Sequence, residues 1–135
     1  MLNFNVKIKT YIMKSFLFSV LFISLTATFY SQEFSVVGKS QSVSELIQSK
    51  NNGIYTFYFP NSITKDKIET AANYYPTYFS YSINDEENSI KISLTENNSA
   101  NRKIIMRFLM SARLQKIKVG ETELFIQDFY QNYLN

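Results

Sequence analysis

The chain has 135 residues, which is room for one domain. It contains no cysteine and no histidine, and this excludes disulfides, thiolate nucleophiles, Ser-His-Asp triads and the usual zinc sites. The formal charge of +3 lies in residues 1–31, because eleven basic side chains balance eleven acidic ones from Gln32 onward, so the remainder has no electrostatic reason to bind nucleic acid.

Residues 1–31 are typical of a cleavable signal peptide. A lysine precedes an apolar run over 16–23, and 26–31 can serve as the cleavage region. The apolar stretch is about 14 residues long, whereas a helix that spans a bilayer needs roughly 20. An uncleaved anchor and a buried N-terminal helix are the alternatives, and Met13 is an alternative start. We predict export to the periplasm or the extracellular space, a mature chain that begins near Gln32, and no stable membrane insertion after cleavage.

The first predicted elements follow a polar stretch. Residues 32–41 are predicted to be a flexible lead-in to one α+β domain over 42–135. The spacing of Ser42 and Glu45 matches a capping box and predicts a short helix that ends before Asn51-Asn52-Gly53. Residues 54–59 are β-branched and aromatic throughout, which predicts an interior strand with both faces covered.

A helix and a hairpin are predicted next. Thr64 can cap the helix, Pro76 blocks its continuation, and its buried face comprises Ile68, Ala71, Ala72 and Tyr75. Residues 78–84 and 90–94 alternate between apolar and polar side chains, and the polar turn over 85–88 joins them. This pattern predicts a hairpin with one solvated face.

The last third of the chain predicts a second long helix, a short hairpin and a terminal turn. The helix has an apolar stripe made by Ile104, Ile105, Phe108, Leu109 and Ala112. Strands are predicted around 117–119 and 124–126, with a turn over 120–122 between them. Asp128 is predicted to cap a terminal helical turn.

From Ile54 the predicted order is strand, helix, strand, strand, helix, strand, with an extra N-terminal helix and a C-terminal hairpin and helical turn. Over residues 54–119 this order resembles the ferredoxin-like split βαβ arrangement, an antiparallel sheet with helices on one face. It is similar to heavy-metal-associated domains, which bind metal through a Cys-x-x-Cys loop after the first strand. Residues 59–64 of this chain read FPNSIT at that place. The resemblance therefore implies the fold alone, and we predict neither a cofactor nor a metal ligand.

The aromatic side chains are concentrated in one part of the sequence. Nine tyrosines and phenylalanines fall between residues 55 and 81. Most are expected to fill the core, but tyrosine combines an apolar ring with a polar tip and is favoured at binding surfaces. The candidate partner-binding residues are those beside Pro76, namely Tyr74, Tyr75 and Tyr78.

We interpret the chain as an exported, non-enzymatic module that binds a protein or peptide, with no catalytic residue predicted. One alternative is a small-ligand or metal-ion carrier, which needs a concave pocket with convergent polar groups. Another is a hydrolase that uses the carboxylates of Glu121, Glu123 and Asp128. Residues 85–87 are acidic and suit either a weak calcium site or a solvated turn. A basic set off the apolar stripe suits solvent or an acidic partner: Arg102, Lys103, Arg107 and Arg113.

Overall fold

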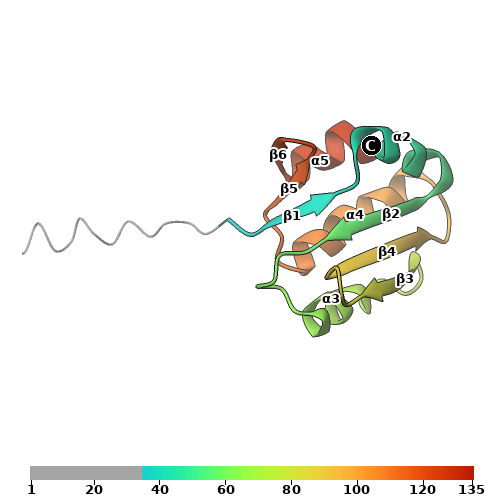
Figure 1. Cartoon of the computed structure of the whole chain (residues 1–135). Coiled ribbons are helices and arrows are strands. Elements are labelled where there is room, and N and C mark those ends of the chain that lie inside the picture. The colour runs from blue at the N-terminus through green and yellow to red at the C-terminus, as the bar shows by residue number, and fades with distance from the viewer. Residues whose placement is uncertain (1–34) are drawn as a thin grey trace, which may run out of the picture. The chain divides into compact units, whose positions relative to one another are not determined.

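The computed structural model describes residues 35–135, so the predicted signal peptide and the start of the predicted lead-in lie outside the described residues (Figure 1). The described part is α+β, with helices packed on a mixed six-stranded sheet. Between residues 35 and 135, no helix is long and apolar enough to cross a membrane.

Strands and helices are interspersed along the chain, and the segment after α5 is a π-helical turn called η2. In chain order the elements are β1 (Val37–Ser40), α2 (Val43–Asn52), β2 (Ile54–Tyr58), α3 (Lys65–Ala72), β3 (Phe79–Asn84), β4 (Ser89–Leu94), α4 (Ser99–Ser111), β5 (Lys116–Val119), β6 (Thr122–Phe125), α5 (Ile126–Phe129) and η2 (Tyr130–Leu134). The strand order across the sheet is β3-β4-β2-β1-β5-β6. β1 and β5 are parallel, and the other neighbouring strands are antiparallel.

Strand β1 corrects the predicted flexible lead-in over 32–41. It lies inside the sheet, where Lys39 pairs with Tyr58 of β2 and Val37 pairs with Lys116 of β5. Four residues without an alternating pattern carry no strand signal of their own, and partners far along the chain supply the pairing. β1 therefore separates β2 from β5, which are the first and last strands of the predicted order.

A glycine lets β1 fit between its neighbours. A Cβ atom on Gly38 would lie 2.7 Å from Cδ1 of Leu114 and 3.1 Å from the carbonyl oxygen of Tyr58. The first distance is shorter than real Cβ atoms show and the second is tight, so a larger residue here would displace the Leu114 side chain, and glycine allows the close approach of β1 to the core.

One face of the sheet holds the core. Along β2 the side chains of Tyr55 and Phe57 are buried, whereas Ile54, Thr56 and Tyr58 are half-buried on the opposite face. The expectation that both faces of this strand are covered is therefore wrong, because the major helices pack on the same face of the sheet as Tyr55 and Phe57.

Aromatic contacts join the helices to that face. The ring of Phe108 on α4 lies 5.7 Å from that of Phe79 on β3, and the ring of Phe129 on α5 lies 6.1 Å from that of Phe57. Figure 1 shows α4 behind β2 and β4. The predicted stripe of α4 is buried along its whole length: Ile104, Ile105, Phe108, Leu109 and Ala112.

Local capping signals set where α2 begins and ends. Ser42 Oγ accepts from the backbone N–H of Glu45, and a carboxylate oxygen of Glu45 accepts from the N–H of Ser42 at 2.9 Å, which confirms the capping box. Gly53 has a φ of 75° and donates its N–H to the carbonyl of Ser49 at 2.7 Å. This left-handed conformation ends the helix at low cost because glycine has no Cβ.

The predicted role of Asp128 as a cap is wrong. β6 runs directly into α5, so the residue at the N-cap is Phe125, and Asp128 lies inside the first turn. The helix begins where the hairpin strand ends, and no loop remains in which Asp128 could act as a cap.

Candidate functional site

The structure separates the three candidate tyrosines. The hydroxyl of Tyr75 lies 3.0 Å from Oγ of Ser111, and its ring packs 6.1 Å from the ring of Phe79. Tyr75 is half-buried and ties the segment after α3 to α4. Tyr74 and Tyr78 are exposed, at 72% and 41%. Tyr74 and Tyr78 are therefore more accessible to a partner than Tyr75 is.

Tyr74 lines a groove of about 610 Å³ between α3 and the C-terminal end of α4. The groove contains small side chains, charges of both signs and one aromatic ring, and its lining is Asp66, Lys67, Thr70, Ala71, Tyr74, Ser111, Ala112 and Arg113. Ala71 and Ala112 are buried. Tyr78 is not among the lining residues, so the two exposed tyrosines do not share one pocket.

Arg113 occupies an unusual backbone position at that groove. Its φ is 71°, a left-handed conformation in which glycine is the usual residue. The N–H of Arg113 donates to Met110 O at 3.0 Å, and the N–H of Leu114 donates to Leu109 O at 3.1 Å, which together close a Schellman motif. Arg113 therefore holds a long side chain at a backbone position where glycine is favoured, and this side chain lines the groove.

Strand β3 forms one edge of the sheet and is hydrogen-bonded to β4 alone. The N–H of Thr95 donates to Tyr78 O and the N–H of Leu94 donates to Gly53 O. Because backbone groups of alternate residues point to opposite sides of a strand, Ser80 and Ser82 bond to β4. The N–H and C=O groups of Tyr81 and Ile83 then point away from the sheet.

The edge at β3 lacks two of the usual protections against pairing, which are charged residues and proline. Its six residues, FSYSIN, include no charge and no proline. The opposite edge is different: β6 has four residues, includes Glu123 and continues into α5. Short length, charge and a covering helix all reduce pairing with another strand. β3 is therefore the sheet edge that is open to a further strand.

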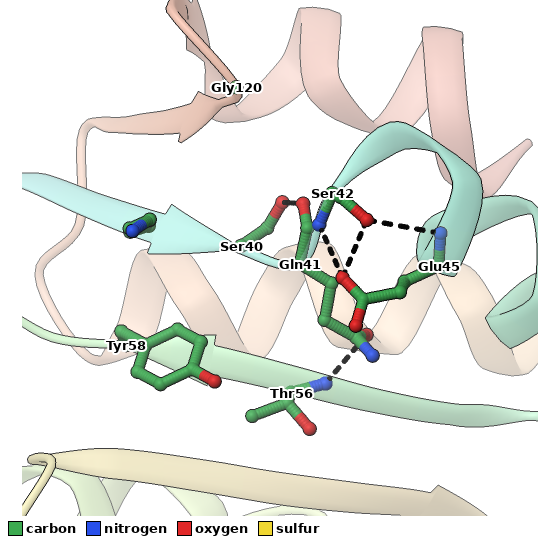
Figure 2. A pocket seen from close by; sticks show the side chains of 8 residues that line it. Ser40, Gln41, Ser42, Glu45, Thr56, Tyr58 and Gly120 are labelled. Atoms are coloured by element: carbon green, nitrogen blue, oxygen red, sulfur yellow. Dashed lines mark hydrogen bonds between the residues drawn. The ribbon is translucent and has the colours of Figure 1, made fainter.

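A polar pocket of about 450 Å³ lies where β1 ends, on the open face of the sheet (Figure 2). After Ser40 the chain leaves the sheet, and Oε1 of Gln41 accepts the N–H of Thr56 at 3.0 Å in place of a strand partner. The same oxygen accepts the hydroxyl of Ser49 at 3.1 Å. The lining residues come from β1, α2, β2 and the β5–β6 turn: Lys39, Ser40, Gln41, Ser42, Glu45, Thr56, Tyr58 and Gly120.

The pocket includes one cation and one anion. Oε2 of Glu45 accepts from the hydroxyl of Ser42 at 2.6 Å and from its N–H at 2.9 Å, and these bonds lower the pKa of Glu45. In the part of the chain that the structure describes, Oε1 of Glu45 has no hydrogen bond and Lys39 has no salt bridge. Sequence reasoning identified Glu45 as a capping residue but did not place Lys39, Thr56 and Tyr58 beside it.

The other candidate side chains do not gather into a site. Asp85 pairs with Lys65 at 2.8 Å, and Glu121 pairs with Lys118 at 3.2 Å. Among residues 35–135, no three His, Cys, Asp or Glu side chains are placed to hold a metal ion. Arg102 donates from Nε to Leu134 O at 2.6 Å, which fixes η2 against α4.

Comparisons with known proteins returned no match: no family model, no curated protein and no solved structure matches this chain.

Proposed function

We propose that this protein is a non-catalytic module that binds an extended peptide segment of a protein partner at β3. The observation that carries the proposal is the edge of β3, which has no charge and no proline and has the backbone groups of Tyr81 and Ile83 directed outward. A peptide that adds to such an edge gains main-chain hydrogen bonds for affinity and side-chain contacts for specificity.

The exposed tyrosines support this proposal. Tyr78 directly precedes β3 and is 41% exposed, so a peptide strand beside β3 can contact its ring. Tyr74 belongs to the segment that leads from α3 into β3 and lines the groove with Arg113. Tyrosine and arginine are among the side chains enriched at protein interfaces.

Two further proposals concern the architecture and the compartment. We assign the domain to the ferredoxin-like type with one inserted strand, because β4 lies between β2 and β3 and is antiparallel to both. We also propose export, on the signal-like composition of residues 1–31.

Intact-mass measurement of the processed protein tests export. We expect a mature chain that begins near Gln32, because the apolar run over 16–23 is short for a membrane anchor. Recovery of the uncleaved chain in the membrane fraction contradicts this expectation.

Amide hydrogen exchange tests peptide binding at β3. Peptides selected from a displayed random library against residues 32–135 serve as ligands. In the free domain, the amides of Tyr81 and Ile83 should exchange quickly because they face away from the sheet, and that of Ser82 should exchange slowly because it bonds to β4. Bound peptide should slow exchange at Tyr81 and Ile83. If the slowed amides lie around Tyr74 instead, the binding site is the groove and the β3 proposal is wrong.

A proline variant and a matched control separate backbone pairing from side-chain contact. Ile83→Pro removes an N–H that faces solvent, a place where an edge strand tolerates proline. Ile83→Ala removes most of the same side chain but keeps the N–H. Titration should show affinity reduced about tenfold or more in Ile83→Pro and about threefold or less in Ile83→Ala. Equal affinities for the two variants contradict strand addition.

A further inference from the structure

We propose that the pocket at the end of β1 binds a small zwitterion, a free α-amino acid. Its ammonium group would contact Glu45, and its carboxylate would contact Lys39 and the hydroxyls of Thr56 and Tyr58. This site is separate from the β3 edge in sequence and in strand position, and the proposal does not depend on peptide binding.

The pocket exists because a strand stops inside the sheet. β1 pairs with β2 only from Lys39 to Ser40, and beyond that point the side chain of Gln41 completes the bonding of Thr56. Because β1 ends opposite Phe57, no residue of β1 lies beside Thr56, and the pocket opens there, next to the Lys39–Tyr58 pair. Its volume of about 450 Å³ lies within the range of about 300–1,000 Å³ of small-molecule sites.

Gln41 is held in one orientation at this site. Its Oε1 accepts two hydrogen bonds, from Thr56 N–H and from the hydroxyl of Ser49, so Nε2 is the end of the amide that stays available. Ser49 is buried, which keeps this contact away from water. Figure 2 shows Gln41 between Ser42 and Thr56, with Tyr58 on the same strand as Thr56.

The charges decide which class of ligand fits. Glu45 offers an ionised oxygen that no described group binds, and Lys39 offers an ammonium group without a salt bridge in residues 35–135. A simple anion would be attracted by Lys39 and repelled by Glu45. A simple cation would be attracted by Glu45 and repelled by Lys39. A neutral sugar would leave both charges without a partner. A zwitterion satisfies both, and charge-assisted hydrogen bonds are the stronger kind.

Calorimetric titration with matched compounds tests the proposal. The probes are L-alanine, L-glutamine and L-phenylalanine. N-acetyl-L-alanine lacks the ammonium charge, L-alaninamide lacks the carboxylate, and glucose is neutral. We expect saturable binding of at least one amino acid, with a Kd below about 1 mM, and binding of both blocked alanines that is at least about tenfold weaker than that of alanine. The proposal is contradicted if none of the three amino acids saturates the site at about 10 mM. It is also contradicted if glucose is the only compound that binds.

Variants identify the charges responsible. Glu45→Gln keeps the capping box, which accepts glutamine, and removes the charge. Lys39→Met removes the charge and keeps much of the aliphatic part of the side chain. Lys91→Met is the matched control, because Lys91 lies on the same face of the sheet but outside the pocket. Glu45→Gln and Lys39→Met should each weaken amino-acid binding about tenfold, while Lys91→Met leaves it unchanged. Equal effects of Lys39→Met and Lys91→Met would mean that general surface charge, and not this pocket, attracts the ligand.

Discussion

Phe108→Ala should lower the free energy of unfolding by about 3–5 kcal/mol. Phe108 is fully buried on α4, where its ring lies 6.3 Å from the ring of Phe59 and 5.7 Å from that of Phe79, edge-on to both. The substitution removes these contacts and leaves a cavity that helix and sheet cannot close without moving. A domain of this size has only about 5–15 kcal/mol of stability, and no disulfide limits its unfolded state.

Arg107→Ala is the matched control for this loss. Arg107 is the preceding residue on the same helix but is exposed, so its removal should change the free energy of unfolding by less than about 0.5 kcal/mol. Urea unfolding of the two variants gives the comparison. Small losses of equal size in both would show that α4 is not docked on the sheet through this stripe.

Alkaline pH should destabilise the domain through Tyr55. The side chain is fully buried on β2, and burial raises the pKa of Tyr55 to about 12. The unfolded chain releases the phenolic proton near pH 10, whereas the folded chain retains it up to about pH 12. The contribution of Tyr55 to the free energy of unfolding is therefore fully present below about pH 10. It falls as the pH rises to about 12, by about 3 kcal/mol in all.

Tyr55→Phe isolates that contribution. Among the described residues, the Tyr55 hydroxyl is the buried side-chain polar atom without a hydrogen-bond partner, so its removal should not destabilise the protein at pH 7. Urea unfolding from pH 9 to pH 12 should show a smaller loss in Tyr55→Phe than in the parent chain.

Tyr81→Phe is the comparison for Tyr55→Phe, because it removes a tyrosine hydroxyl that does have a hydrogen-bond partner. The Tyr81 hydroxyl donates to Oδ1 of Asn73 at 2.8 Å, so its removal should cost about 0.5–1.5 kcal/mol at pH 7. A neutral-pH loss in Tyr55→Phe as large as that in Tyr81→Phe would show that the Tyr55 hydroxyl has a partner, such as a buried water.

The candidate sites differ in how far sequence could predict them. Tyr74 and Tyr78 are candidates because tyrosine is favoured at binding surfaces and both lie beside Pro76, and both are exposed. Tyr75 has the same local signal but turns inward, because Ser111 on α4 provides a partner for its hydroxyl. The pocket at the end of β1 has no sequence signal, since Lys39, Glu45 and Tyr58 meet only through strand pairing and the start of α2.

Local interactions made the start of α2 and the two hairpins predictable from the sequence. The capping box of Ser42 and Glu45 spans four residues, and the hairpin of β3 and β4 joins strands through a short turn. The buried stripe of α4 follows from helical periodicity alone, and Phe108 lies on it. Each of these features depends on residues that are near one another in the chain.

Tertiary structure decided the features that depend on distant partners. β1 is a strand because β2 and β5 supply its hydrogen bonds, and its own sequence, VGKS, has no strand pattern. Its insertion separates β5 from β2, and its end at Ser40 leaves Thr56 without a β1 partner at the pocket. The open edge at β3 likewise follows from sheet order, which local propensity does not determine, because pairing between distant strands is selected by the packing of the whole domain.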